Sequence, residues 1–162
     1  MSDRPSPDEV HLPWTIPDVV WASLKAEAAQ KDALSEKAEW TRELRPDFNF
    51  VGLLGEHFYS FLSGLPRKTG FGDGGEDFPG IDVKTVAYYY DPILKVNEIR
   101  TSYYALVAVA LESRLIRYCG YADRAMIERA PTSTFGKNSA AHALHEATLI
   151  RGLCPAPAPE AT

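Results

Sequence analysis

The sequence lacks the features that mark membrane, secreted and disulfide-rich proteins. No run of apolar residues approaches the ~18 that span a bilayer, and the polar, proline-rich start MSDRPSPDEVHLP is unlike a signal peptide. Only two cysteines occur, Cys119 in an apolar segment and Cys154 near a proline-rich end, which favours reduced thiols over a disulfide framework or a thiolate metal site. We expect a soluble, cytoplasmic protein without membrane contacts.

An excess of positive charge is also lacking. The 162 residues include 17 Lys and Arg against 22 Asp and Glu, for a formal net charge of -5. Long-range attraction to nucleic acid is therefore excluded, and any phosphate contact would need a local basic patch. The length and the 45% apolar content suit one globular domain with its own core.

The composition of the chain ends predicts two disordered tails. Residues 1–13 and 155–162 are rich in proline and polar residues and cannot bury enough apolar surface to offset their ordering entropy. A single domain is thus expected over residues 14–154. Its amino-terminal part, residues 17–45, consists of good helix formers, and we expect one long helix from Asp18 to Glu43 or two with a break near Asp32.

A second helix is expected over residues 48–66, with Asn49 as its cap and Gly64 followed by Pro66 at its end. Helical spacing gathers one apolar stripe: Val51, Leu54, Phe58, Phe61, Leu62 and Leu65. Glu56 falls nearly opposite this stripe, beside Gly52 and Ser63. A face of such small residues can lie close to other backbone.

The remainder predicts strands over residues 81–90, 103–111 and 115–121, a short helix over 122–130 and a last helix over 139–150. The fold class is α/β (α+β), with a central mixed sheet flanked by helices and a core over residues 48–130.

Carboxylates are concentrated just before and within the first of these strands. Asp73, Glu76, Asp77 and Asp82 occur close together, and Lys84 follows on the same strand face as Asp82. Converging carboxylates repel one another unless a cation neutralises them, and hard oxygen ligands suit Mg²⁺ or Mn²⁺. A neighbouring lysine can hold a water or balance phosphate charge. The alternative is turn residues beside a solvated ion pair.

The helix with GLLGEHF, the acidic residues and the strand IDVKT, followed by YYALVAVAL and RLIRYCGYA, resemble the PD-(D/E)XK nuclease superfamily over about residues 48–127. This resemblance implies a restriction-endonuclease-like fold in which Asp82, Val83 and Lys84 lie on the central strand. It implies Asp77, Asp82 and the Val83 carbonyl as ligands of Mg²⁺ or Mn²⁺. It further implies Lys84 as the catalytic lysine and Glu56 as a supporting acid, reaching the metal through a hydrogen bond or water.

Two details depart from the family pattern. Glu76 stands where a proline usually precedes the first aspartate, and the short DFPGI stretch between Asp77 and Asp82 forces a tight hairpin. A brief loop of this kind is similar to that of the DNA mismatch-repair nicking endonucleases. Asp73 is an alternative first aspartate.

Basic and aromatic residues near the proposed site suggest substrate contacts. Arg67, Lys68, Lys95 and Arg100 are candidates for binding DNA phosphates, or form a solvated rim. Tyr88, Tyr89, Tyr90, Tyr103 and Tyr104 could stack on bases or pack within the sheet. His142 and His145, three apart on the expected last helix, lack a third ligand, and we expect surface residues there.

The sequence thus predicts a Mg²⁺- or Mn²⁺-dependent DNA endonuclease that acts as a homodimer or within a larger protein complex. The alternative is a catalytically inactive nuclease-fold protein that binds nucleic acid or protein as an assembly subunit.

Overall fold

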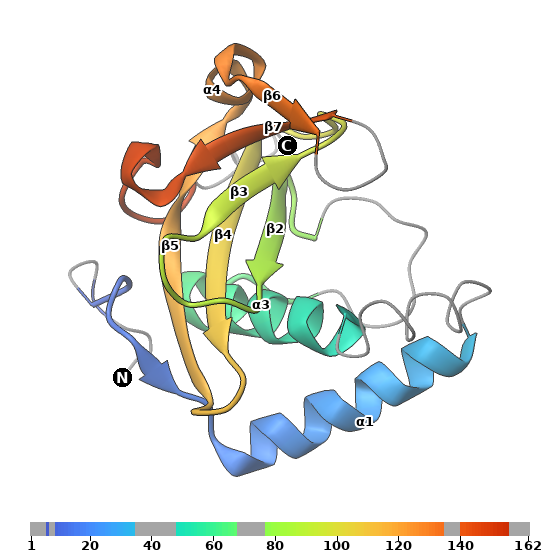
Figure 1. Ribbon diagram of the computed structural model, residues 1–162. Helices are drawn as coiled ribbons and strands as arrows, with labels where there is room; N and C mark the ends of the chain where they lie inside the picture. Colours follow the sequence, from blue (N-terminus) through green and yellow to red (C-terminus); the bar gives the residue numbers. More distant parts are fainter. Residues whose placement is uncertain (1–5, 7–8, 35–47, 68–76, 135–139, 156–162) are drawn as a thin grey trace, which may run out of the picture.

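Two β-sheets and three α-helices make up the described part of the chain (Figure 1). The computed structural model describes residue 6 and residues 9–34, 48–67, 77–134 and 140–155. In chain order the elements are β1 (Trp14–Thr15), α1 (Asp18–Leu34), α3 (Phe48–Ser63), β2 (Ile81–Val86), β3 (Ile93–Val96), β4 (Tyr103–Ala110), β5 (Leu115–Asp123), α4 (Arg124–Arg129), β6 (Thr132–Thr134), β7 (Ala140–His145) and the 3-10 helix η1 (Glu146–Thr148). The predicted mixed α/β class is confirmed at this level.

The larger sheet has the strand order β1-β5-β4-β2. β4 and β5 form the predicted antiparallel pair, whereas β2 runs parallel to β4, with Asp82 opposite Tyr104. Among the described strands β2 therefore has a neighbour on one side only, and within this part of the chain the Asp-x-Lys strand lies at the edge of the sheet and not at its predicted central position. The reason is the connection after Val86, which leads into β3 of the other sheet before the chain returns as β4.

The smaller sheet, ordered β3-β7-β6, corrects two sequence predictions. The strand expected over residues 81–90 ends at Val86, and the helix expected over 139–150 is β7 followed by η1. Leu94 and Val96 of β3 are buried and pair with β7, so the strand pairing overrides the helix propensity of an alanine-rich segment.

The two histidines of β7 do not share a face. Residues 142 and 145 are an odd number of positions apart in one strand, so their side chains point to opposite faces. The His142 Nδ1 also bonds to the Ala130 carbonyl oxygen at 3.1 Å, whereas His145 is exposed. This pair is therefore no metal-binding unit.

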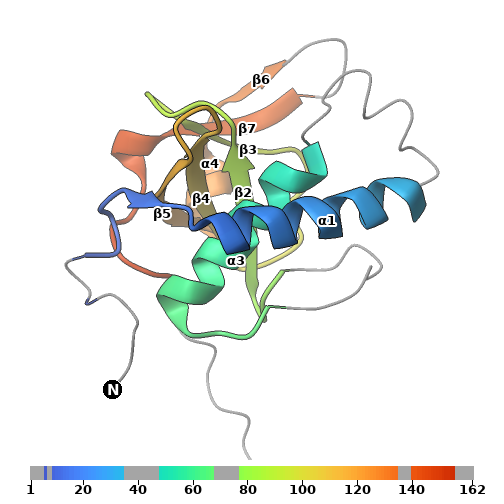
Figure 2. The same cartoon turned by 90° about the horizontal axis from the view of Figure 1, so that it is seen from below.

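Helices α1 and α3 lie on the face of the larger sheet opposite β3 and β7, and α1 crosses α3 (Figures 1 and 2). As predicted, α3 ends before Gly64, whose φ of 77° is left-handed. It begins at Phe48, so Asn49 lies in its first turn and is not its cap. α1 passes through Asp32 without a break, and the expected extension to Glu43 lies outside the described residues.

The segment before β1 packs on the domain. Val10 is only 2% exposed and belongs to the core under α3. The His11 Nδ1 bonds to the Tyr118 carbonyl oxygen at 3.0 Å, and the Gly152 N–H donates to the His11 Nε2 at 2.8 Å. The predicted disordered tail, residues 1–13, is therefore too long, because it includes Val10 and His11, which pack on the domain. In the described part of the chain, no helix is both long and apolar enough to cross a membrane.

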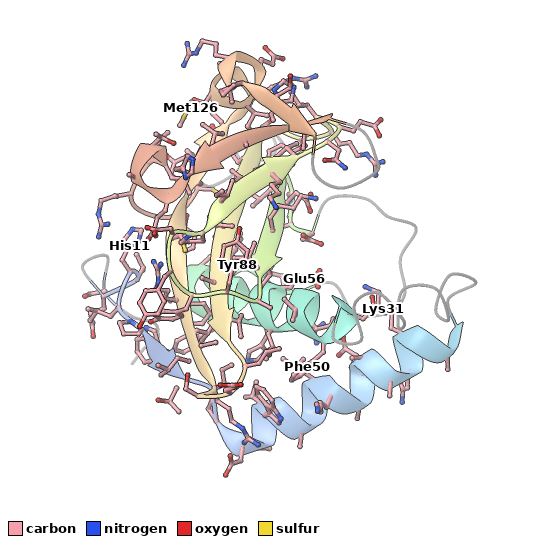
Figure 3. The ribbon with its side chains drawn as sticks, in the orientation of Figure 1. His11, Lys31, Phe50, Glu56, Tyr88 and Met126 are labelled. Carbon is pink, nitrogen blue, oxygen red and sulfur yellow. The ribbon has the colours of Figure 1, made fainter. Side chains whose placement is uncertain are left out.

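A close contact between α3 and β2 occurs at Gly55. A Cβ atom added there would lie 1.7 Å from the Thr85 Oγ1, whereas one added at Gly52 would meet nothing within 4 Å. The backbones thus approach at Gly55, and the small-residue face predicted around Gly52 is not the contact face. Glu56, the next residue, is thereby held beside β2 (Figure 3).

We expect Gly55→Ala to destabilise the protein by about 1 to 3 kcal/mol, because the new methyl group overpacks the contact with Thr85. Gly52→Ala is the matched control and should stabilise the same helix by about 0.5 to 1 kcal/mol. Urea unfolding of both variants measures the difference. Equal stabilities would show that α3 does not approach β2 at Gly55.

Candidate active site

A tight turn brings Asp77 back to the strand that follows it. The N–H of Phe78 donates to the Ile81 carbonyl oxygen and the N–H of Ile81 to the Phe78 carbonyl oxygen, both at 2.9 Å, and Gly80 adopts a φ of 74°. The predicted hairpin between Asp77 and Asp82 is therefore present. Its result is that the Asp77 Oδ2 accepts a hydrogen bond from the Val83 N–H at 2.8 Å.

This hydrogen bond lies at the edge of β2 that faces away from β4. Backbone groups of successive strand residues point to alternate edges, and the N–H and C=O of one residue point to the same edge. The Val83 carbonyl therefore opens on the same edge as the Asp77 carboxylate. The proposed carbonyl ligand and the proposed first aspartate lie on one side of the strand.

Asp82 and Lys84 share a face of β2, as the period of a strand predicts. The Lys84 Nζ lies 3.1 Å from the Asp82 Oδ2, and the Lys84 side chain is 42% exposed. Their face is the one toward β3, because Val86 packs with the core beneath that strand, whereas Ile81 and Val83 pack with α3. Solvent reaches the lysine while most of Asp82 is covered.

Asp77 is the middle member of a row of three carboxyl groups. Burial raises the pKa of Asp77 to about 6. The hydrogen bonds with Asp82 and the Val83 N–H lower this pKa, and Glu56 raises it further. Burial, and then Asp77, raises the pKa of Asp82 to about 6, and Lys84 opposes this. Asp77 and Asp82 therefore favour one shared proton over full ionisation below about pH 6.

The donor set suits a hard divalent cation that keeps part of its water shell. Within residues 9–34, 48–67, 77–134 and 140–155, no three carboxylate, imidazole or thiolate side chains already converge as a metal cage. Mg²⁺ is commonly bound through one or two carboxylates together with water. Asp77, Asp82 and the Val83 carbonyl fit that requirement, and Glu56 stands behind Asp77. Asp73 and Glu76 lie outside the described residues.

The predicted phosphate contacts have different surroundings. Arg67 donates two hydrogen bonds to Glu27, at 2.7 and 2.8 Å, and thus links α1 to the chain after α3. Arg100 is exposed, bonds to Glu98 at 2.9 Å and lies near enough to Asp82 for that charge to raise its pKa, after the larger effect of Glu98. Lys95 is exposed on β3, and Lys68 lies outside the described residues.

Sequence reasoning missed the residues that set the position of the acids. Gly55 and Thr85 fix the distance between α3 and β2, and the Phe78–Ile81 turn directs Asp77 to Val83. The two glycines of GLLGEHF signal a close approach, but helical periodicity alone does not say which of them makes it.

Comparison with known proteins adds no relative. No protein-family model matches the chain, and neither the curated proteins nor the solved structures contain a match. The functional argument therefore rests on the chain's own residues and their geometry.

We expect Asp77→Asn to stabilise the protein at pH 7.5 in the presence of a chelator. The asparagine Oδ1 can still accept from the Val83 N–H, and its amide can donate to Asp82 or Glu56. Because the pKa values of Asp77 and Asp82 are raised in the folded protein, the native state binds more protons than the unfolded state. The free energy of unfolding therefore falls as the pH rises from about 4 through 6. The expected gain is about 1 to 2 kcal/mol at pH 7.5 and less at pH 5.

Urea unfolding at both pH values measures this gain. The matched control is Glu112→Gln, an exposed turn residue, which should show no comparable change. A gain of the same size at both pH values would contradict a raised pKa at Asp77.

Proposed function

We propose that this protein is a divalent-metal-dependent DNA endonuclease of the PD-(D/E)XK type, with a restriction-endonuclease-like fold. The observation that carries the proposal is the convergence at β2 of Asp77, from the preceding turn, with Asp82 and Lys84 of the strand. The Val83 N–H orients Asp77, and the Asp82 Oδ2 holds Lys84. Glu56, from α3, completes the row of acids. The same residues carry the resemblance in the sequence.

The chemistry divides among these residues. Asp77, Asp82 and the Val83 carbonyl would hold Mg²⁺ or Mn²⁺, which when bound polarises the scissile phosphate and lowers the pKa of water. The Lys84 ammonium, 3.1 Å from Asp82 and partly exposed, can hold the attacking water and balance charge that develops on the phosphate. Glu56 acts through Asp77, since its hydrogen bond and its charge raise the pKa of that aspartate.

The proton on the acid row has a consequence for metal binding. Carboxylates must be ionised to bind a cation, and the raised pKa values of Asp77 and Asp82 mean that protons compete with the cation. Metal binding and cleavage should therefore strengthen as the pH rises through about 6.

Assembly is part of the proposal. The net charge of -5 and the small size leave little basic surface for DNA. Action as a homodimer or within a larger protein complex would supply further phosphate contacts.

We expect the purified protein to cleave DNA with Mg²⁺ or Mn²⁺ and not with chelator. Lys84→Ala should lower the rate about a hundred- to a thousandfold, because it removes a charge that stabilises the transition state. Arg129→Ala on α4, an exposed basic residue far along the chain from β2, is the control for loss of positive charge. The assay uses supercoiled plasmid, linear duplex and single-stranded DNA.

Calorimetry with Mn²⁺ separates binding from catalysis. Asp82→Asn should lose metal binding, whereas Lys84→Ala should keep it. Wild-type protein that binds neither cation and cuts no DNA would favour the inactive assembly subunit instead.

A further inference from the structure

The loop between β2 and β3, residues 87–92, presents exposed aromatic rings. Tyr90 is 83% exposed and Tyr88 is 41% exposed, whereas Tyr104 is buried and Tyr103 is partly buried. Packing within the sheet therefore applies to Tyr103 and Tyr104. Tyr88 and Tyr90 of the loop face solvent instead. Large exposed aromatic side chains next to a candidate site indicate a binding surface.

Arg117 of β5 fixes the backbone of this loop. The Arg117 Nη2 donates to the Tyr89 carbonyl oxygen at 2.8 Å, and the guanidinium lies 4.9 Å from the centre of the Tyr89 ring. Glu146 binds the same guanidinium through both carboxylate oxygens. The Tyr89 ring is thus an anchor that lies between the two exposed rings in sequence.

Both exposed rings have further support. The Ile93 N–H donates to the Tyr88 hydroxyl at 3.2 Å, and the Tyr90 ring meets the Tyr89 ring edge to face at 5.5 Å. Side chains that are already positioned lose little entropy when a ligand binds. The rings are therefore prepared for stacking on a flat partner.

The loop lies on the same side of the larger sheet as Lys84. Figure 1 shows the chain crossing from the end of β2 toward β5 before it turns into β3, and Figure 3 places Tyr88 beside the end of β2. Arg117 pairs with Ala108, which pairs with Val86, two residues after Lys84. The backbones of Lys84 and Arg117 are thus two strand spacings and two residues apart, roughly 12 Å. A few nucleotides span this distance.

Charge argues against duplex DNA as the main ligand of this surface. The net charge is -5, and the two described arginines near the acids, Arg67 and Arg100, are paired with Glu27 and Glu98. Affinity for duplex comes largely from phosphate contacts by free basic residues. Stacking on aromatic rings requires bases with free π faces, which unpaired nucleotides offer and a stacked duplex does not.

We propose that Tyr88 and Tyr90 form a stacking platform for unpaired bases beside the scissile phosphate, so that the substrate is single-stranded DNA or a single-stranded segment of a longer DNA. This inference rests on the proposed nuclease function and adds its substrate class. Tyr89, Arg117 and Glu146 position the platform and do not contact the bases.

The test is fluorescence anisotropy with labelled oligothymidine and a labelled duplex of equal length, in chelator so that no cleavage occurs. Wild-type protein should bind the single strand more tightly than the duplex. The double variant Tyr88→Ala/Tyr90→Ala should weaken single-strand binding about ten- to a hundredfold. Tyr90→Phe should keep it, because the ring remains and the hydrogen bond from the Ile93 N–H to the Tyr88 hydroxyl is untouched. Val19→Ala, at an exposed apolar residue of α1, is the control.

Each other result counts against the platform. Duplex binding as tight as single-strand binding, no binding of either DNA, or unchanged affinity in the alanine variant would overturn it. Loss in the phenylalanine variant equal to that in the alanine variant would assign the effect to the Tyr90 hydroxyl group and also overturn stacking.

A parallel cleavage assay with Mg²⁺ keeps the two proposals apart. Cleavage of duplex that is independent of both tyrosines would leave the nuclease and remove the platform. Tyrosine-dependent binding of single strands without metal-dependent cleavage would support the platform and remove the nuclease.

Discussion

The contact between Gly55 and Thr85 is the constraint on which the candidate site depends. It brings the backbone of α3 against β2 with no room for a Cβ atom, and so it sets how far Glu56 reaches toward the strand edge. Asp77 meets Glu56 there only because the Phe78–Ile81 turn returns it to the Val83 N–H. Two local features, a helix glycine and a four-residue turn, thus combine acids that come from separate parts of the chain. A shift of α3 away from β2 would separate Glu56 from Asp77 while leaving the pair of Asp82 and Lys84 intact.

Among the described strands β2 lies at a sheet edge, and this position shapes the chemistry open to it. A central strand uses both rows of its backbone groups for pairing, but an edge strand leaves one row unpaired. On β2 the row that faces away from β4 includes the N–H and the C=O of Val83, and Asp77 occupies the first of these groups. The carbonyl beside it is left to face the same region as the carboxylates. The edge position, which sequence reasoning did not foresee, is therefore what makes the Val83 carbonyl available as a ligand.

Local patterns in the sequence were sufficient for some elements and for part of the site. The apolar stripe and the glycine stop predicted α3, and a period of two placed Asp82 and Lys84 on one face. The segment over residues 139–150 could not be predicted in this way, since its helix-favouring alanines become a strand through pairing with Leu94 and Val96 of a strand that was itself missed. The direction of Asp77 depends on turn geometry, and the pairing of Arg67 with Glu27 depends on how α1 meets α3. Contacts between distant segments decided the first and the last of these outcomes, and the backbone geometry of a local turn decided the direction of Asp77.

The charge balance of the acid row ties stability to function. Lys84 pairs directly with Asp82, and Arg100 acts on Asp82 from farther away, whereas Asp77 has Asp82 and Glu56 as its carboxyl neighbours. Burial makes the full ionisation of Asp77 and Asp82 costly, and a shared proton relieves the cost at acidic pH. Under the proposed function, a bound divalent cation would relieve it more completely, because it would neutralise two carboxylates at once and bring its own water into the space that Lys84 borders. A cluster of acids that destabilises the metal-free protein is typical of a cation-binding site. A cation that binds the native state would stabilise it and offset this cost.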